Sequence, residues 1–233
     1  MVSGMARQFV TGVLKLNTGF PRLQGDIGNP DSLHGAVIFE TVSDANPASV
    51  ITGKPLPQSL VSAFVNSARI LINHPVDLIT TSCGFLLPIQ STLTQLSNVP
   101  VITSSLLLLP LLRSMHGNHI GVLTFDRDKL ITTRCDIDMP EAVEGLQTDG
   151  TLRQTIARNH ATLDRSQAQQ EVLSCAAQLL AQWPQTRALV LECTNLSPYK
   201  QALRLQTGLP VYDLIDAIHW QQAATSCEQS QPG

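Results

Sequence analysis

Short runs of apolar, often β-branched residues alternate along the chain with longer stretches in which apolar residues recur every three or four positions. The short runs indicate buried strands, and the longer stretches indicate amphipathic helices. The predicted strands cover residues 10–16, 35–42, 76–82, 99–104, 119–125, 141–147, 187–192 and 209–215. The predicted helices cover residues 57–73, 88–97, 105–115, 127–134, 150–160, 164–182, 198–207 and 215–224. This alternation predicts an α/β fold with parallel sheets covered by helices.

The pattern occurs twice. The stretches "TTSCGFLLP" and "LECTNLSP" each end an apolar run at a cysteine, with a leucine three residues and a proline five residues later. Cys83 and Cys193 are 110 residues apart, and Gly12 and Gly121, in the first strand of each copy, are 109 residues apart. A shared offset of this length predicts two copies of one α/β unit.

The repeat predicts how the chain divides into domains. We expect a first domain over residues 1–104 and a second over residues 105–212, with a C-terminal helix in 213–233 that packs back on the first. Each domain should contain a four-stranded parallel sheet, and the two should be related by a pseudo-two-fold axis. Because ligands gather at the carboxyl ends of parallel strands, the active site is expected in the interdomain cleft.

Composition narrows the function classes. The chain has 233 residues, of which 43% are hydrophobic and 14% charged, and its net charge is −3. The stripe of Lys and Arg that binds phosphates is therefore not expected, and nucleic acid is not a predicted partner. The first ten residues lack the apolar core of a signal peptide, and the apolar run around Leu106–Leu112 is too short to span a membrane. We expect a soluble cytoplasmic protein with no membrane contact.

The remaining cysteines and a histidine pair have simpler explanations. Cys175 falls on the apolar face of the helix predicted at 164–182, so it should be a core residue. Cys227 lies in a polar tail and Cys135 near a helix end, and neither is given a role. The five cysteines are not spaced as a disulfide framework or a zinc knuckle. His116 and His119 resemble a turn before a strand, so no metal site is predicted.

Two equivalent cysteines at strand ends suggest a chemistry. If the strand ends face each other, one thiolate can remove a proton from a carbon and the opposite thiol can return one on the other face. Pro88 and Pro198 are expected in the first turn of a helix, with Ser197 as an N-cap. The helix ends should then lower the thiol pKa values and hold a carboxylate.

Polar residues at other strand ends fit the same cleft. Asn17 and Thr18 follow the first strand, Asp126 occupies the equivalent position in the second copy, and Ser104 ends the fourth strand. Arg22 has two interpretations from sequence: it binds a second substrate carboxylate, or it is a solvated loop residue.

The two cysteine turns, together with "LNTGFPR" after the first strand, resemble the cofactor-independent aspartate/glutamate racemase superfamily over nearly the whole chain. The resemblance implies that Cys83 and Cys193 transfer the protons and that no pyridoxal phosphate or other cofactor is used. It implies substrate-binding roles for Asn17, Thr18, Gly84, Phe85, Ser104, Thr194 and Asn195. Two positions depart from the family pattern: Cys-Gly-Phe replaces Cys-Asn-Thr at the first site, and Asn195 replaces a histidine at the second.

These observations predict an isomerase: an amino-acid racemase for aspartate- or glutamate-like substrates that works by two-base proton transfer. The alternatives are a hydantoin racemase or one-thiol decarboxylase of the same fold, and a non-catalytic protein that binds a small carboxylate. The predicted partner is a small carboxylate, and a homo-oligomer is compatible with the sequence.

Overall fold

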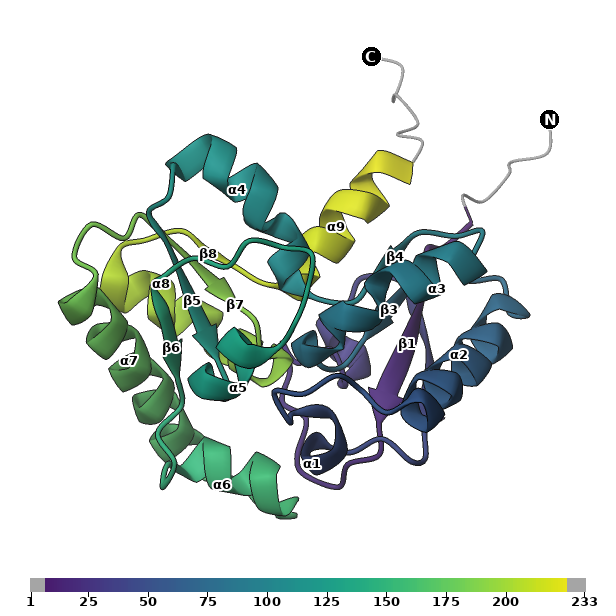
Figure 1. The fold of residues 1–233 in the computed structure, drawn as a ribbon, viewed down its shortest axis with the longest axis horizontal. Helices are drawn as coiled ribbons and strands as arrows, with labels where there is room; N and C mark the ends of the chain where they lie inside the picture. Colours follow the sequence, from purple (N-terminus) through teal and green to yellow (C-terminus); the bar gives the residue numbers. More distant parts are fainter. Residues whose placement is uncertain (1–6, 226–233) are drawn as a thin grey trace.

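The computed structural model describes residues 7–225, which form two α/β units side by side (Figure 1). Cys227 and the end of the predicted 213–233 segment lie outside the described residues. No helix within residues 7–225 combines the length and apolar character needed to cross a lipid bilayer.

The first sheet is entirely parallel, with strand order β2-β1-β3-β4. Its strands are β1 (Val10–Leu16), β2 (Ala36–Val42), β3 (Leu78–Thr81) and β4 (Val101–Ile102). The helices of this unit are α1 (Pro47–Val50), α2 (Gln58–Ile72), α3 (Gln90–Leu96) and two short 3₁₀ helices (Pro30–Ser32 and Gly84–Ile89).

The second sheet has the equivalent order, β6-β5-β7-β8, and is also parallel. Its strands are β5 (Ile120–Thr124), β6 (Val143–Gly145), β7 (Ala188–Leu191) and β8 (Val211–Tyr212). The helices are α4 (Leu109–His116), α5 (Arg127–Thr132), α6 (Thr151–Arg158), α7 (Arg165–Gln182), α8 (Lys200–Thr207), α9 (Leu214–Thr225) and 3₁₀ helices at Ser105–Leu108 and Thr194–Tyr199. The matching strand orders confirm the predicted duplication.

The repeated glycines have a packing role. A Cβ at Gly121 of β5 would lie 2.7 Å from Leu179 of α7, and one at Gly12 of β1 would lie 3.2 Å from Leu71 of α2. Each glycine lets the covering helix approach the central strand closely. Cys175 packs in this helix–sheet core and is 1% exposed, as predicted.

Helix α9 leaves the second sheet and returns to the first (Figure 1). Leu214 and Ile218 pack with Val13 and Leu78 against the first sheet, on a small core separate from the main one. The strand predicted over 209–215 is therefore too long. It ends at Tyr212 because Asp213 and Asp216 cap α9 reciprocally, each accepting a hydrogen bond from the other's backbone N–H at 3.1 and 2.9 Å.

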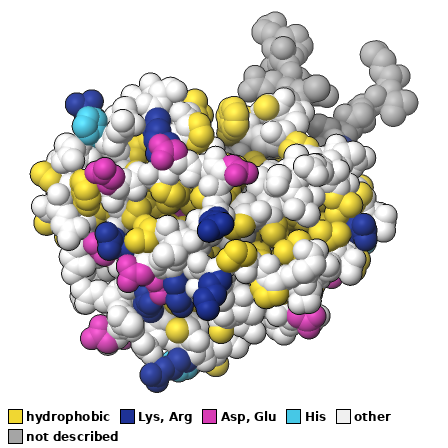
Figure 2. Space-filling view, in the orientation of Figure 1, with side chains coloured by type: hydrophobic (Ala, Val, Ile, Leu, Met, Phe, Trp, Pro, Cys, Tyr) yellow, Lys and Arg dark blue, Asp and Glu magenta, His cyan; other side chains and the backbone are white. Residues whose placement is uncertain are grey.

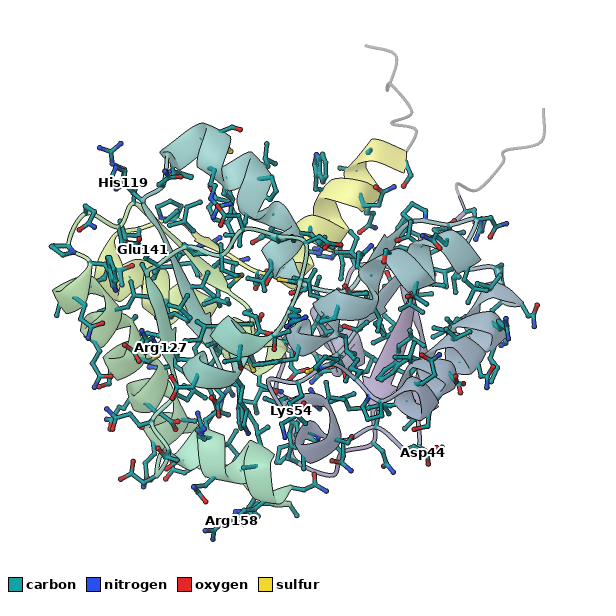
Figure 3. The ribbon with its side chains drawn as sticks, viewed as in Figure 1. Asp44, Lys54, His119, Arg127, Glu141 and Arg158 are labelled. Carbon is teal, nitrogen blue, oxygen red and sulfur yellow. The ribbon has the colours of Figure 1, made fainter. Side chains whose placement is uncertain are left out.

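Several loops of one unit contact helices of the other along the seam between the units. The loop that carries Gly53 and Lys54 lies against α5, and Lys54 appears at the seam in Figure 3. Asn159, at the end of α6, accepts hydrogen bonds from the backbone N–H groups of Gly19 at 2.7 Å and Phe20 at 3.1 Å. On the face drawn in Figure 2, basic and acidic side chains are interspersed.

Candidate active site

A small, mainly apolar pocket lies at the seam, where the carboxyl ends of β3 and β7 meet. Six of the residues with predicted site roles line it: Cys83, Gly84, Phe85, Cys193, Thr194 and Asn195. Its other lining residues are Leu16, Phe20, Arg22, Pro47, Ile51, Ser82, Phe125, Ile156 and Glu192. The fold thus brings both cysteines to one pocket.

Each cysteine stands immediately before a 3₁₀ helix rather than several residues ahead of an α-helix. The carbonyl oxygens of Cys83 and Cys193 accept hydrogen bonds from the N–H groups three residues later, at 3.2 and 3.0 Å. Pro88 and Pro198 therefore lie inside these 3₁₀ helices, and their predicted first-turn position is wrong. The predicted N-cap role of Ser197 is also wrong, since its buried hydroxyl has no hydrogen-bond partner among the described residues.

The two cysteine turns touch each other. The Thr194 hydroxyl donates a buried hydrogen bond of 2.9 Å to the carbonyl oxygen of Ser82. Gly84 lies against Glu192 so closely that a Cβ would collide with the Glu192 carbonyl oxygen. The two turns can approach this closely because the residue after Cys83 is a glycine, which has no side chain.

The thiols are held in the protonated form. Burial raises the pKa of Cys83 to about 12, and the neighbouring Glu192 contributes to this rise. Burial and then Glu192 also raise the pKa of Cys193 well above its usual value. Backbone N–H groups of Phe85 and Asn195 lower these pKa values but do not outweigh burial. The expectation that helix ends lower the thiol pKa values is wrong, because desolvation dominates in this closed pocket.

Glu192, to which the sequence motifs assign no role, is a fully buried acidic side chain in the pocket lining. Its side chain is fully buried, and its Oε2 accepts a 2.6 Å hydrogen bond from the Thr124 hydroxyl. Its Oε1 has no hydrogen-bond partner within residues 7–225. Burial raises the pKa of Glu192 to about 8. A signal was present in the sequence: one acidic residue ends the otherwise apolar run "ALVLE".

Arg22 is not a solvated loop residue, and only part of its guanidinium group is free to bind a carboxylate. Its side chain is only 11% exposed and pairs with Asp26 at 3.0 Å. It also donates to the Thr18 hydroxyl at 3.0 Å, while its buried Nε has no partner in the described part of the chain. Asp26 additionally accepts from the amide of Asn195, and Asn195 Oδ1 lies 3.7 Å from the Cys193 sulfur. One polar network therefore joins Arg22 to the second cysteine.

The other predicted polar residues lie outside the pocket lining. Asn17 donates to the Ser43 carbonyl oxygen at 3.2 Å. Ser104 is fully buried and caps the following 3₁₀ helix. Asp126 caps α5 and pairs with Arg153 at 2.6 Å. Thr18 reaches the pocket through Arg22.

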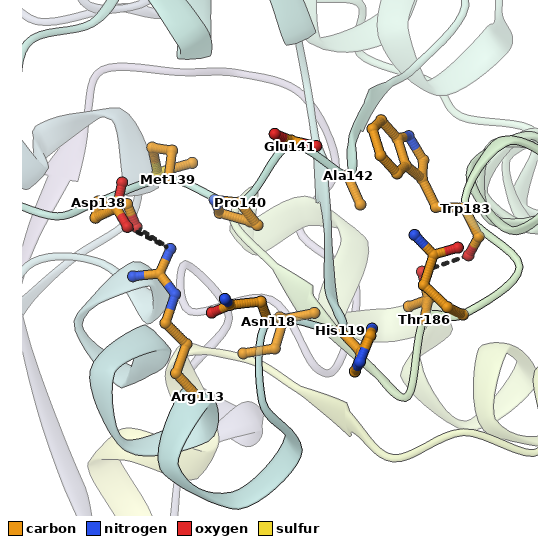
Figure 4. A pocket seen from close by; sticks show the side chains of 12 residues that line it. Arg113, Asn118, His119, Asp138, Met139, Pro140, Glu141, Ala142, Trp183 and Thr186 are labelled. Carbon is orange, nitrogen blue, oxygen red and sulfur yellow. Dashed lines mark hydrogen bonds and ion pairs between the residues drawn. The ribbon is translucent and has the colours of Figure 1, made fainter.

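A wider pocket lies elsewhere, on the second unit (Figure 4). Its lining includes His119, Glu141, Trp183 and the Arg113–Asp138 ion pair of 3.3 Å. It lies by the residues that precede β5, at the amino ends of the strands, where α/β folds do not usually bind substrates. Within the described residues, no three His, Cys, Asp or Glu side chains gather as a metal site would require.

Two parallel α/β units, with a cysteine turn from each at one pocket, form the arrangement expected from the resemblance to the racemase superfamily. The Asp/Glu/Hydantoin racemase family model matches residues 30–222, and the chain belongs to this family. The predicted family is confirmed.

Solved structures agree on the fold. A glycine-to-cysteine mutant of arylmalonate decarboxylase matches with a TM-score of 0.62 and 14% identity, covering 96% of this chain and 97% of that one. Allantoin racemase from Klebsiella pneumoniae matches with a TM-score of 0.62 and 15% identity, covering 92% of this chain and 86% of that one. The predicted fold class is therefore confirmed.

Curated relatives are more similar in sequence. A dimethylsulfoniopropionate lyase of Durusdinium sp. clade D is 28% identical over 222 residues, covering 88% of this chain and 71% of that protein. Dimethylsulfoniopropionate lyase 7 of Emiliania huxleyi (strain CCMP1516) is 28% identical over 223 residues, covering 89% of this chain and 64% of that protein. The predictions of an amino-acid racemase and of an isomerase are wrong, because these relatives are named as lyases. A pair of thiols is compatible with proton transfer at carbon in both classes of enzyme and does not distinguish inversion from elimination.

Proposed function

We propose that the protein is a lyase that removes a proton from a small carboxylate and expels an onium group from its β-carbon. Dimethylsulfoniopropionate, which has a dimethylsulfonium group on the carbon β to its carboxylate, is the substrate to test first. The base takes the α-proton, the C–S bond breaks, and the products are acrylate and dimethyl sulfide. The sulfur leaves as a neutral molecule, so this step needs no acid to protonate the leaving group.

The charge balance of the pocket carries the proposal. The lining holds three acids, namely Cys83, Cys193 and Glu192, and one cation, Arg22, which is already paired with Asp26. Forming a thiolate there requires a compensating positive charge. Dimethylsulfoniopropionate brings a sulfonium cation with a single carboxylate and has no net charge, whereas an aspartate- or glutamate-like substrate has a second carboxylate and a net charge of −1.

The lining also suits the two ends of such a molecule. The buried Nε of Arg22 lacks a partner among the described residues and can donate a charge-assisted hydrogen bond to a carboxylate. The Phe85 ring belongs to the lining and can contact the methyl groups of a sulfonium cation through a cation–π interaction.

Cys83 is the cysteine that loses its proton more readily. Arg22 lowers the pKa of Cys83, whereas Cys83 itself raises the pKa of Cys193. The Cys193 sulfur also has the Asn195 side-chain oxygen as a hydrogen-bond acceptor at 3.7 Å, which favours the neutral thiol. We assign Cys83 as the base and Cys193 as a neutral thiol facing the same substrate, with Gly84, Phe85, Thr194 and Asn195 completing the walls.

The proposal includes a division of the chain into domains of residues 1–104 and 105–212, with the C-terminal segment on the first. The first sheet ends at Ile102, the second begins at Ile120, and α9 packs against the first sheet, which supports this division. Substrate entry would then require the two domains to separate slightly, because both thiols are less than one-tenth exposed.

The experiment is a direct assay with the purified chain. Headspace gas chromatography should detect dimethyl sulfide from dimethylsulfoniopropionate, and proton NMR should detect an equal amount of acrylate. 3-(Methylthio)propionate, which lacks the positive charge, should not be cleaved. Release of dimethyl sulfide no faster than that of a Cys83→Ala variant would refute the proposal.

A further inference from the structure

Asp26 is a buried carboxylate that lies outside the pocket lining but binds two residues that belong to it. It is 1% exposed and lies in the connection between β1 and β2. Both of its oxygens accept hydrogen bonds from Arg22, at 3.0 and 3.2 Å. Its Oδ2 also accepts a hydrogen bond from the side-chain amide of Asn195, in the 3₁₀ helix that follows Cys193. Asp26 therefore connects one lining residue from each unit.

The loop that carries Asp26 is held in place by contacts of its own. Oδ1 of Asp26 accepts a hydrogen bond from the Gly28 N–H at 2.6 Å. Gly25, with a φ of 101°, is pressed against the second cysteine turn, because a Cβ there would lie 2.8 Å from the Cα of Pro198. The position of the carboxylate is thus set by its loop, and the Asn195 side chain has to adapt to it.

This contact determines which way the Asn195 amide faces. A carboxylate accepts hydrogen bonds and has none to donate, so the amide turns Nδ2 toward Asp26. The two ends of the planar amide point apart, and Oδ1 lies 3.7 Å from the Cys193 sulfur. An oxygen at that place accepts a hydrogen bond from the neutral thiol and offers none to a thiolate. With the amide reversed, Nδ2 would donate to the sulfur and favour the thiolate.

We propose that Asp26 is a positioning residue, which fixes the orientation of the Asn195 amide and thereby keeps Cys193 in the neutral thiol form. It acts through Asn195 and touches neither the sulfur nor the substrate. The titratable groups that face Cys193 are Glu192, Cys83 and Asp26. The inference deepens the proposed function and rests on it only for the consequence that Cys83 is left as the base.

The test measures initial rates of alkylation by iodoacetamide at pH 8.5, with peptide mapping by mass spectrometry. The readout is the ratio of the Cys193 rate to the Cys83 rate. Asp26→Asn offers an NH2 group to Asn195 and so allows its amide to reverse. The ratio should rise about tenfold or more, as expected when an acceptor is exchanged for a donor at a charged sulfur. Asp31→Asn, the same charge change at an exposed position of the same connection, should leave the ratio unchanged.

A double variant separates the orientation of the amide from the charge of Asp26. That charge raises the pKa of Cys193 and also that of Cys83, so its loss alone favours both thiolates. Asn195→Leu removes the amide and keeps a side chain of similar size. In this background, Asp26→Asn should change the ratio by less than about twofold. A tenfold rise that persists without the amide overturns the proposal, as does an unchanged ratio in Asp26→Asn alone.

If Asp26→Asn does not fold, Asn195→Leu decides the question through the sign of its effect. With Oδ1 facing the sulfur, the substitution withdraws an acceptor from the Cys193 thiol, and the ratio should rise about two- to tenfold. With the amide reversed, it would withdraw a donor from the thiolate, and the ratio would fall. A fall, or no change, overturns the proposal.

The alkylation test needs no substrate, so it separates the two proposals. If the ratio responds as expected but no dimethyl sulfide is released, the role of Asp26 stands and the proposed lyase activity falls. If dimethyl sulfide is released but the ratio does not respond, the lyase stands and the role of Asp26 falls.

Discussion

The hydroxyl of Thr194 donates a buried 2.9 Å hydrogen bond to the carbonyl oxygen of Ser82, and so ties the residue after the second cysteine to the residue before the first. The bond crosses the seam between the two sheets and helps to fix the position of the two thiols relative to each other. Thr194→Val keeps the shape but leaves the Ser82 carbonyl without this donor. We expect a loss of about 1–3 kcal/mol in the free energy of unfolding, measured with urea, and a fall in kcat for dimethyl sulfide release.

Thr186→Val is the matched control for this prediction. Thr186 is also buried, but its hydroxyl donates to the nearby Trp183 carbonyl oxygen at 2.7 Å within one unit. It should lose stability while keeping kcat. Equal effects of the two variants on kcat would mean that the seam bond has no special role.

The two thiols should be unequal. Cys83→Ser should lower kcat for elimination by about 10²–10⁴-fold, because serine is a much weaker acid and cannot supply the base. Cys193→Ser should retain a larger share of activity. Cys175→Ala, in the core of the second unit, should keep kcat and lose stability only. Steady-state assays of the three variants test this order, and equal losses at both pocket cysteines would restore a two-thiol mechanism.

Arg22 should act on substrate binding. Arg22→Lys keeps a positive charge beside Asp26 but removes the Nε donor and the planar fork. We expect KM to rise about tenfold or more, with a smaller change in kcat, since one charge-assisted hydrogen bond contributes about 1.5–3 kcal/mol. An unchanged KM would place the substrate carboxylate elsewhere in the pocket.

Asn159 should control how the loop that carries Phe20 closes the pocket. Its backbone is left-handed, with φ of 55°, and its side chain bonds Gly19 and Phe20 across the seam. Asn159→Gly suits this backbone and removes only the bridge, so it should raise KM without unfolding the protein. Asn159→Asp, which keeps the accepting oxygen, should stay close to the unsubstituted enzyme. A KM for Asn159→Gly equal to that of the unsubstituted protein would contradict this role.

Glu192 should also make stability depend on pH. Its folded-state pKa of about 8 lies above the unfolded value, so the folded protein binds the extra proton between about pH 4.5 and pH 8. This stabilising effect is fully present below about pH 4.5 and is lost as the pH rises through 8. Urea unfolding at pH 5.5 and 8 should show a decrease of more than about 1 kcal/mol that is absent in Glu192→Gln. The same decrease in both proteins would assign it to other groups.

Much of the fold was predictable because it depends on local patterns. The helix predicted over 57–73 is observed as Gln58–Ile72, and the one over 164–182 as Arg165–Gln182, since long amphipathic helices have a clear period. The duplication was visible because each copy needs a glycine in its central strand and a cysteine turn at its third. The apolar pattern predicts a strand over 209–215 that is longer than the observed Val211–Tyr212, because apolar periodicity carries no signal for the reciprocal cap between Asp213 and Asp216 that starts α9.

The sequence by itself determined the two α/β units and the two cysteine turns, because these depend on periodicity and spacing. Only the tertiary structure decided whether the thiols of Cys83 and Cys193 are protonated. Asp26 and Asn195 are 169 residues apart, and Thr124 and Glu192 are 68 apart, yet each pair is hydrogen-bonded at the pocket. Protonation depends on burial and on such distant neighbours, so a spacing that predicted activated thiols could not reveal that desolvation keeps them neutral.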